Sequence, residues 1–236
     1  MKVLVFNGSP KGTEQSVTLS LTQKFLDGMK ECRPDMDYEI LHIKDMEIDH
    51  CRGCSVCWRS KTGKCVIDDD ASRTIPKYVA ADVVIWSFPI YIYGPPSKTK
   101  ACIDRIVFPC LMPDIYLDNR GVILHPWRYP KLIDQRQVLI STCGFPQVER
   151  NYDGLFASLD IISRRFTRIV CAGTMAMRLP AYEKEVATYY ELMQQAGREY
   201  AVNGELTWQT AEKIENVISD EDGYAKYIDD FNAFFA

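Results

Sequence analysis

Short apolar runs alternate along the chain with polar loops and with segments that carry apolar residues at helical spacing. The pattern predicts five strands, at residues 2–6, 38–43, 82–87, 137–142 and 168–172, and the apolar runs at 2–6 and 82–87 indicate buried strands. Helices are expected between and after them, at residues 18–30, 72–80, 97–107 and 154–164. Because the apolar runs are continuous and do not alternate with polar residues, we expect these strands to be covered on both faces.

The alternation of strand and helix predicts the α/β class, with a doubly wound parallel sheet of five strands in the order 2-1-3-4-5. Three segments depart from the simple pattern. Residues 45–70 form a polar, cysteine-rich loop, and residues 108–136 are too long for a simple crossover, so we interpret them as an insertion. The tail from Tyr182 onward is helical in pattern and is expected to pack on the core or on a partner subunit.

The composition narrows the classes of function. The chain has 236 residues and a net charge of −4, with no block of lysine and arginine, so it gives no reason to expect nucleic-acid binding. No apolar stretch approaches the ~20 residues needed to cross a bilayer. The apolar run at residues 2–6 is too short for a signal peptide, so we expect a cytoplasmic protein with reduced thiols. Small core positions are predicted for four of the nine cysteines, namely Cys32, Cys102, Cys110 and Cys171.

The loop at residues 7–18 follows the first predicted strand and leads into the first helix. In a doubly wound fold this position binds ligands, and its backbone N–H groups, hydroxyls and helix dipole can hold a terminal phosphate. The loop contains neither the Gly-x-Gly-x-x-Gly fingerprint nor a Gly-Lys-Ser/Thr triplet, so one phosphomonoester is the better interpretation. The alternative is a capped turn that binds nothing.

Two further loops follow the third and fourth predicted strands. Residues 87–96 combine aromatic side chains with a backbone constrained by proline, which suits packing beside a flat heterocycle. Residues 141–146 end at the same edge of the sheet. The three loops together predict one crevice that holds a phosphate at one end and a ring at the other, although ordinary packing also accounts for each tyrosine singly.

Four cysteines lie in a fifteen-residue window with the spacing C-x2-C-x2-C-x7-C, at Cys51, Cys54, Cys57 and Cys65. Thiolates at this spacing can surround a cubane iron–sulfur cluster. Zinc is a second possibility, although its ligands more often come as two separated pairs. Free thiols with a structural or redox role are the third, and the spacing leaves all three open. In the insertion, His125 and its aromatic neighbours are interpreted as loop packing or as a lid over the crevice.

Several of these motifs together resemble a known family. Gly-Ser-Pro-Lys at residues 8–11, Ser-x-Pro-x-Tyr at 87–91 and Lys-Ala-Cys-Ile-Asp-Arg at 100–105 resemble the NAD(P)H-dependent FMN reductases of the flavodoxin-like superfamily. With the cysteine window added, the chain is similar to the iron–sulfur flavoprotein-like branch. Residues 1–175 would then form a flavodoxin-like FMN-binding domain, and residues 176–236 a helical C-terminal extension of the same domain.

The resemblance implies which residues bind the cofactors. The FMN phosphate would contact Ser9, Lys11, Gln15, Ser16, Val17 and Thr18. The ring and ribityl chain would contact Pro89, Ile90, Tyr91, Ile92, Tyr93, Gly94, Thr142, Cys143 and Gly144. A [4Fe-4S] cluster would be ligated by Cys51, Cys54, Cys57 and Cys65.

The function implied is an FMN-dependent oxidoreductase. NAD(P)H would reduce the flavin, which would pass electrons to a quinone, a free flavin, an aromatic compound, a metal ion or a protein. The alternative is an electron carrier that takes electrons from ferredoxin through the cluster and FMN without nicotinamide turnover; a flavin-sensing interaction protein is a third hypothesis. The flavin supplies the chemistry, so no catalytic side chain is predicted. A homodimer or homotetramer is expected, with no nucleic-acid or membrane partner.

Overall fold

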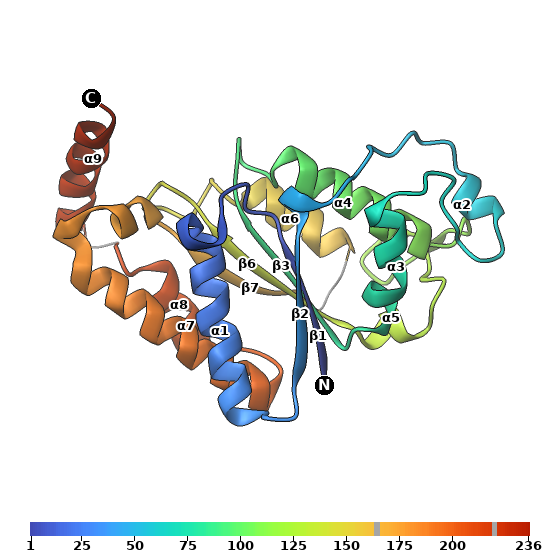
Figure 1. Cartoon of the computed structure of the whole chain (residues 1–236), viewed down its shortest axis with the longest axis horizontal. Helices are drawn as coiled ribbons and strands as arrows, with labels where there is room; N and C mark the ends of the chain where they lie inside the picture. Colours follow the sequence, from blue (N-terminus) through green and yellow to red (C-terminus); the bar gives the residue numbers. More distant parts are fainter. Residues whose placement is uncertain (163–165, 219–220) are drawn as a thin grey trace.

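The computed structural model describes residues 1–162, 166–218 and 221–236, and within them a parallel five-stranded sheet forms the centre of the molecule (Figure 1). Its strands are β1 (Lys2–Asn7), β2 (Asp37–His42), β3 (Val83–Pro89), β6 (Arg136–Thr142) and β7 (Phe166–Cys171). They pair in the order β2-β1-β3-β6-β7. Because β4 and β5 belong to a separate hairpin, this is the predicted order 2-1-3-4-5, and the fold class is confirmed.

Helices cover both faces of the sheet. One layer contains α1 (Val17–Cys32), α7 (Glu183–Asn203) and α8 (Trp208–Glu215). The other contains α3 (Asp70–Ala80), α4 (Ser97–Val107) and α6 (Asp153–Ile162). Successive residues of β1 point to opposite layers: Val3 and Val5 pack with the first layer, and Leu4 and Phe6 with the second. Both faces are therefore apolar, which explains the continuous apolar runs in the sequence.

The shorter elements complete the chain. The α-helices among them are α2 (Val56–Arg59), α5 (Lys131–Asp134) and α9 (Glu221–Phe235). The 3-10 helices are η1 (Thr13–Gln15), η2 (Ile43–Asp45), η3 (Phe108–Cys110), η4 (Thr174–Arg178) and η5 (Pro180–Tyr182). The helix predicted at residues 154–164 corresponds to α6, and its last two predicted residues lie outside the described residues.

The tail includes a helix that packs into the core. Helices α1 and α7 approach so closely that a Cβ on Gly28 would lie 1.9 Å from the backbone oxygen of Gln194. A Cβ on Gly197 would lie 2.0 Å from the backbone oxygen of Phe25. Two glycines therefore allow the backbones to meet, and α7 occupies the place beside α1 on the face of the sheet (Figure 1). The division of the chain at residue 175 stays a prediction.

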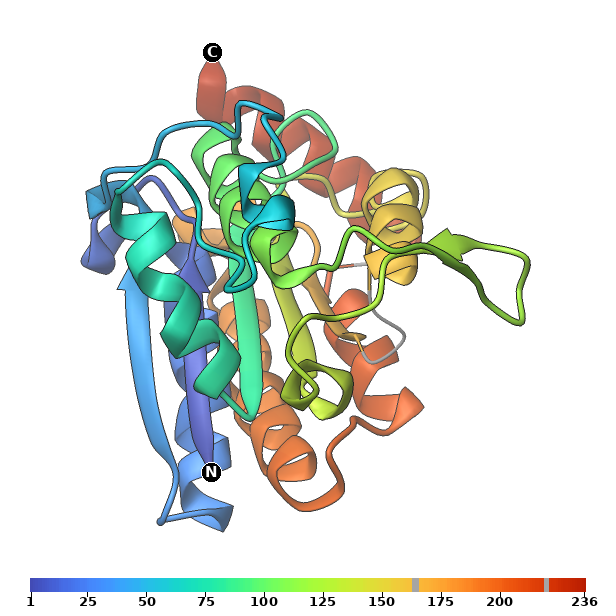
Figure 2. The ribbon, with the colours of Figure 1, turned by 90° about the vertical axis from the view of Figure 1, so that its right-hand side faces the viewer.

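The insertion at residues 108–136 forms a small substructure of its own. Strands β4 (Tyr116–Leu117) and β5 (Ile123–Leu124) pair as an antiparallel hairpin. The hairpin projects away from the body of the molecule (Figure 2). The rest of the insertion runs back along the segment that carries the four cysteines.

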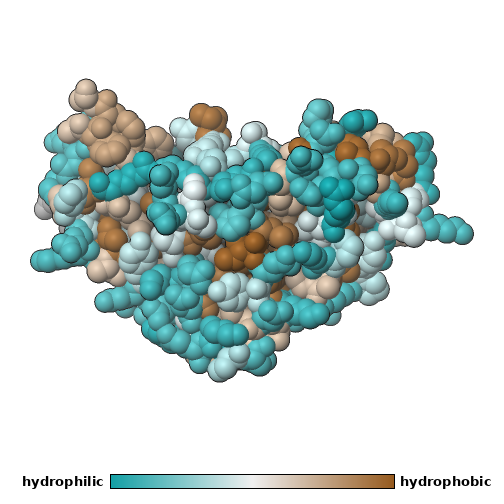
Figure 3. Space-filling view, in the orientation of Figure 1, coloured by the Kyte–Doolittle hydropathy of each residue, from teal (hydrophilic) through white to brown (hydrophobic). Residues whose placement is uncertain are grey.

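Hydrophilic side chains cover most of the face shown in Figure 3, and apolar side chains gather in separate patches. One patch lies at the upper left, over the end of α9, where Phe234 and Phe235 are exposed. Among the described residues, no helix combines the length and the apolar character needed to span a lipid bilayer.

Candidate functional site

A cleft lies at the carboxyl edge of the sheet, where the loops after β1, β3, β6 and β7 meet. The residues that line it are Ser9, Lys11, Val17, Thr18, Pro89, Ile90, Tyr91, Thr142, Cys143, Gly144, Thr174, Met175 and Arg178. The carboxyl edge is where doubly wound sheets bind their ligands. The three predicted loops therefore converge on one cleft, as the sequence indicated.

Local hydrogen bonds shape the loop after β1. The side chain of Asn7 accepts from the backbone N–H of Ser9 at 3.2 Å, and the Ser9 hydroxyl accepts from the N–H of Lys11 at 3.4 Å. Ser16 is the N-cap of α1, because its hydroxyl accepts from the N–H of Leu19 at 3.1 Å. The first turn of the helix follows directly and lines the cleft, with its dipole favouring negative charge there.

The predicted phosphate-binding residues fall into two groups, those that line the cleft and those that do not. Ser9, Lys11, Val17 and Thr18 line the cleft, whereas Gln15 and Ser16 do not. The Ser16 hydroxyl is used as a helix cap, and Gln15 is exposed at the end of η1.

Buried hydroxyls connect the layer beneath the cleft. The Thr18 and Thr142 hydroxyls lie 2.7 Å apart, and those of Thr22 and Ser87 are also 2.7 Å apart. These bonds join α1 to β6 and to β3. The start of α1 is therefore held against the ends of the two central strands, which makes this wall of the cleft rigid.

The loop after β3 makes a strained turn. Tyr91 and Gly94 form a bridge, and the two residues between them, Ile92 and Tyr93, have positive φ of 48° and 60°. Such a conformation is unfavourable for residues other than glycine and asparagine, above all for a β-branched residue such as Ile92. Tyr91 lines the cleft together with Pro89 and Ile90. By contrast, Ile92, Tyr93 and Gly94 do not line it, and Ile92 is 94% exposed.

The loop after β6 contributes Thr142, Cys143 and Gly144 to the lining of the cleft. The thiol of Cys143 donates to the carbonyl of Phe145 at 3.1 Å, and burial raises the pKa of this thiol. Cys143 is therefore a neutral wall residue rather than a thiolate. The carbonyl of Gly144 accepts a hydrogen bond from Tyr227 of α9, so the C-terminal helix supports this loop.

Sequence reasoning missed one part of the cleft, the segment after β7. Thr174, Met175 and Arg178 belong to η4 and line the cleft. The signal was available, because the carboxyl end of the fifth parallel strand must reach the same edge of the sheet. Among the described residues that line the cleft, Lys11 and Arg178 are cationic and none is acidic.

The donor set of the cleft matches the groups of FMN. Lys11, the hydroxyls and the helix start at one side suit a phosphate dianion. Pro89, Ile90 and Tyr91 offer an apolar and aromatic wall for a flat ring. The residues present therefore fit this cofactor.

The four cysteines of the window line a second, smaller cavity, together with Asp104, Arg105 and Phe108. Cys57 is buried, and its thiol pKa is raised first by burial and then by the neighbouring Cys65, Cys51 and Cys54. In the described part of the chain, no group of three or more His, Cys, Asp or Glu residues is arranged to hold a metal ion. The thiols thus share one cavity without standing at ligand positions, and the cavity holds about 20 Å³.

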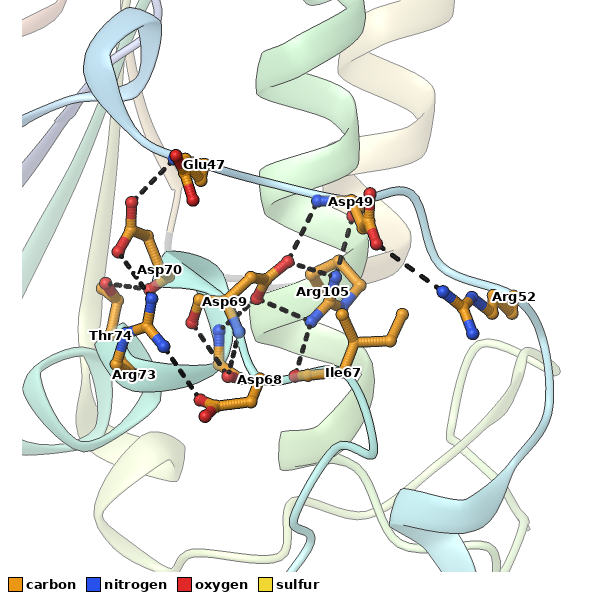
Figure 4. A network of polar contacts seen from close by, with 11 residues as sticks. Glu47, Asp49, Arg52, Ile67, Asp68, Asp69, Asp70, Arg73, Thr74 and Arg105 are labelled. Carbon is orange, nitrogen blue, oxygen red and sulfur yellow. Dashed lines mark hydrogen bonds and ion pairs between the residues drawn. The ribbon is translucent and has the colours of Figure 1, made fainter.

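Two arginines hold the cysteine segment by its backbone. Arg105 of α4 donates hydrogen bonds to the carbonyls of Asp49 and Ile67 and forms a bidentate ion pair with the carboxylate of Asp69 (Figure 4). Arg128 of the insertion donates to the carbonyls of Cys57, Ser60 and Lys61, and also to those of Pro109 and Leu111. The insertion therefore serves as a support for the cysteine segment.

Of the remaining predictions about single residues, those for one histidine and three cysteines are confirmed and one for a fourth cysteine is wrong. His125 packs against Trp58, with ring centroids 4.5 Å apart, so the packing interpretation is confirmed and His125 does not line the cleft. Cys102, Cys110 and Cys171 are buried, as expected for small core residues. Cys32 is exposed, and that prediction was wrong because the residue ends α1 at the surface.

The order of the sheet and the position of the cleft define a flavodoxin-like α/β protein. Within this class the chain belongs to the NADPH-dependent FMN reductase family, whose model matches residues 1–124.

Curated relatives include an iron–sulfur flavoprotein of Methanocaldococcus jannaschii, 33% identical over 105 residues, which are 44% of this chain and 51% of the relative. An FMN-dependent NADH:quinone oxidoreductase of Azospirillum brasilense is 28% identical over 113 residues, 45% of this chain and 54% of the relative. The chain thus spans about half the length of the curated relatives that it matches.

Among solved structures, an FMN-dependent NADH-azoreductase from Bacillus anthracis in complex with FMN superposes with a TM-score of 0.61 at 17% identity. That likeness covers 85% of this chain and 99% of the other. At this identity it establishes the shared fold.

Proposed function

We propose that this chain is an FMN-dependent oxidoreductase that uses NAD(P)H to reduce bound FMN and passes the electrons to a small acceptor such as a quinone, a flavin, an aromatic compound or a metal ion. The observation that carries the proposal is the convergence of the loops after β1, β3 and β6 on one cleft with two cations and no acidic residue among its described lining. The family and the azoreductase and quinone-reductase relatives support the same chemistry.

The roles of the chain's own residues follow from their positions. Lys11, Ser9 and the first turn of α1 would hold the phosphate, and Arg178 would add a second positive charge. Tyr91 and Pro89 would orient the ring, and Thr142 and Gly144 would meet its polar edge with backbone groups. FMN supplies the electron chemistry when bound, while these residues set its orientation and its access to solvent.

The test is FMN binding followed by reduction. Titration of the purified protein with FMN, followed by flavin fluorescence, should give a saturable site at one FMN per chain. A charge-assisted hydrogen bond is worth ~1.5–3 kcal/mol, so Lys11→Met should raise the Kd about 10- to 100-fold. Lys213→Met, at an exposed position on α8, removes the same charge far from the cleft and should leave the Kd unchanged.

Anaerobic addition of NADH or NADPH should then bleach the flavin absorbance of the complex. A protein that binds no FMN would contradict the proposed cofactor. A protein that binds FMN but is reduced by neither nucleotide would contradict the proposed electron donor.

A second candidate rests on the cysteine cavity, which no simple FMN reductase requires. In this alternative the four cysteines would have to leave the positions described above to hold a [4Fe-4S] cluster, and the protein would transfer electrons between a ferredoxin-like donor and FMN. Helix α4 connects the two sites, because Thr99 contacts the loop after β1 while Arg105 reaches the cysteine cavity. These residues are six positions apart, which is about 9 Å along a helix. Rapid flavin reduction by ferredoxin, with none by NADH or NADPH, would favour this candidate.

Assembly and location stay predictions. A homodimer or homotetramer is expected from the family, and sedimentation of the FMN-loaded protein would measure it. A cytoplasmic location is expected because the reduced thiols of the cysteine segment would survive there.

A further inference from the structure

Asn7 and His42 lie side by side at the carboxyl edge of the sheet. They are the last residues of β1 and β2, and the register of the two parallel strands sets them opposite each other. The side-chain nitrogen of Asn7, Nδ2, lies 3.0 Å from Nδ1 of His42. Asn7 is fully buried, whereas His42 is half-buried. The contact thus joins the start of the cleft-lining loop after β1 to the neighbouring strand.

The direction of each hydrogen bond follows from the backbone. The N–H of Ser9 can only donate, so the oxygen of the Asn7 amide, Oδ1, must face it, at 3.2 Å. The Nδ2 group of the same amide then faces His42, and an amide nitrogen also can only donate. Nδ1 of His42 must therefore accept, which places the ring proton on Nε2. The contact requires the neutral ring, because a protonated histidine carries a proton on both nitrogens.

From Asn7 the hydrogen bonds continue into the part of the cleft that suits a phosphate. The Ser9 hydroxyl accepts from the N–H of Lys11 at 3.4 Å, and both residues line the cleft. Gly8, between Asn7 and Ser9, is fixed to β3 by a backbone hydrogen bond of 2.7 Å. Because the Asn7 side chain is fully buried, it cannot replace a lost partner by water, and an unsatisfied buried donor is costly. The shape of the loop therefore depends on the acceptor that His42 provides.

We propose that His42 is a positioning residue for the flavin phosphate: its neutral ring accepts from Asn7 and so holds the loop after β1 in the shape that binds FMN. The inference rests on the proposed function, because the phosphate concerned is that of FMN. Protonation of His42 sets two donors against each other, and turning the Asn7 amide over would only move the conflict to the N–H of Ser9. FMN binding is therefore coupled to the neutral ring, and the affinity should fall as the pH falls.

The charged groups near His42 lie on η2 and α4, whereas β1 contributes the uncharged Asn7. Asp45 and Lys44 of η2 form an ion pair at 2.6 Å, and Lys98 of α4 donates to the carbonyl of Lys44 at 2.9 Å. The pKa of Asp45 is lowered first by its hydrogen bond from Lys44 and also by the nearby charge of the histidine. The carboxylate and the two lysines partly offset each other at His42, which leaves the Asn7 amide as the directional contact.

The experiment measures the Kd of the full chain for FMN and for riboflavin, which lacks the phosphate, by flavin fluorescence. Wild type is compared with His42→Leu, which removes the acceptor, and with His42→Asn, whose Oδ1 is as many bonds from the backbone as Nδ1 and does not titrate. The matched control is His50→Asn, because His50 is exposed and does not line the cleft. Asn7→Ala, alone and combined with His42→Leu, tests whether His42 acts through Asn7.

At about pH 8, His42→Leu should raise the Kd for FMN about tenfold, as expected for one hydrogen bond, and leave the Kd for riboflavin unchanged. His42→Asn should keep the wild-type Kd, and His42→Leu should change little further in the Asn7→Ala protein. At about pH 5.5 every protein loses affinity as the FMN phosphate takes up a proton. Wild type and His50→Asn should lose about fivefold more than His42→Asn, because histidine titrates in this range.

Equal losses of affinity for FMN and riboflavin in His42→Leu would show a general structural role and overturn the inference. A full effect of His42→Leu in the Asn7→Ala protein would overturn it as well. So would parallel pH profiles of wild type and His42→Asn, a comparison that stands even where His42→Leu does not fold. A wild type that binds FMN and is reduced by NADPH, with an affinity indifferent to His42, refutes this inference alone. A wild type that binds no flavin refutes the proposed cofactor too.

Discussion

The crossing of α1 and α7 at two glycines yields a quantitative prediction for Gly28→Ala. The added Cβ would lie 1.9 Å from the backbone oxygen of Gln194 and 2.9 Å from its carbonyl carbon. Ordinary contacts begin near 3.4 Å, and because the obstacle is backbone, no side-chain rotation relieves the clash. The two helices must therefore move apart along the interface.

The cost follows from the loss of contacts. A radial gap of ~0.5–1 Å removes about a quarter to a half of the dispersion attraction between facing atoms, and overpacking typically costs ~1–3 kcal/mol. Alanine recovers ~0.5–1 kcal/mol over glycine inside a helix. Side chains such as Phe25, Met193 and Tyr200 pack in the core that includes this interface. We therefore expect Gly28→Ala to lower the free energy of unfolding by about 2 kcal/mol.

Urea unfolding measured by circular dichroism tests this value. The matched control is Gly154→Ala in α6, where an added Cβ would meet no atom within 4 Å and the same change should stabilise by ~0.5–1 kcal/mol. Gly197→Ala should resemble Gly28→Ala, and the double variant should lose less than the sum, because both act on one crossing. Stabilisation by Gly28→Ala similar to that by Gly154→Ala would refute the close packing of α7 on α1.

Three other substitutions test separate parts of the structure. Burial raises the pKa of Asp69, but hydrogen bonds from its arginine partner and from backbone N–H groups outweigh burial and lower it overall; its contribution to stability is therefore present at neutral pH and lost as the pH falls below about 4. The urea midpoint of Asp69→Asn should therefore fall less steeply at acidic pH than that of wild type. An equally steep fall in both proteins would contradict the ion pair. Gly8→Ala places a Cβ 2.2 Å from the Thr99 hydroxyl and should cost ~1–3 kcal/mol and weaken FMN binding, whereas Gly12→Ala, with open space around it, should do neither. Ile92→Asn removes a β-branched residue from a left-handed position at almost no loss of packing and should stabilise the protein by about 1 kcal/mol in thermal unfolding; destabilisation would contradict the strain inferred at this position.

Much of the fold could be predicted because it depends on local patterns. The central strands β1, β3 and β6 coincide with apolar runs, which report burial on both faces, whereas the edge strand β2 is exposed or half-buried along its whole length. The helix predicted at residues 97–107 is α4 with the same bounds. The position of the cleft could be predicted as well, since the carboxyl ends of parallel strands share one edge. The residue types in the loops after β1, β3 and β6 then indicated a phosphate and a ring.

The sequence by itself therefore determined the class of fold, the edge that binds a ligand and the chemistry expected there. Only the tertiary structure decided which side chains are available for that chemistry. It assigned the Ser16 hydroxyl to a helix cap, added Arg178 to the cleft, and brought Arg105 to the ends of the cysteine segment. The physical reason is that periodicity reports burial, whereas hydrogen-bond partners 36 or 56 residues apart, such as those of Arg105, are set by how the helices and loops pack.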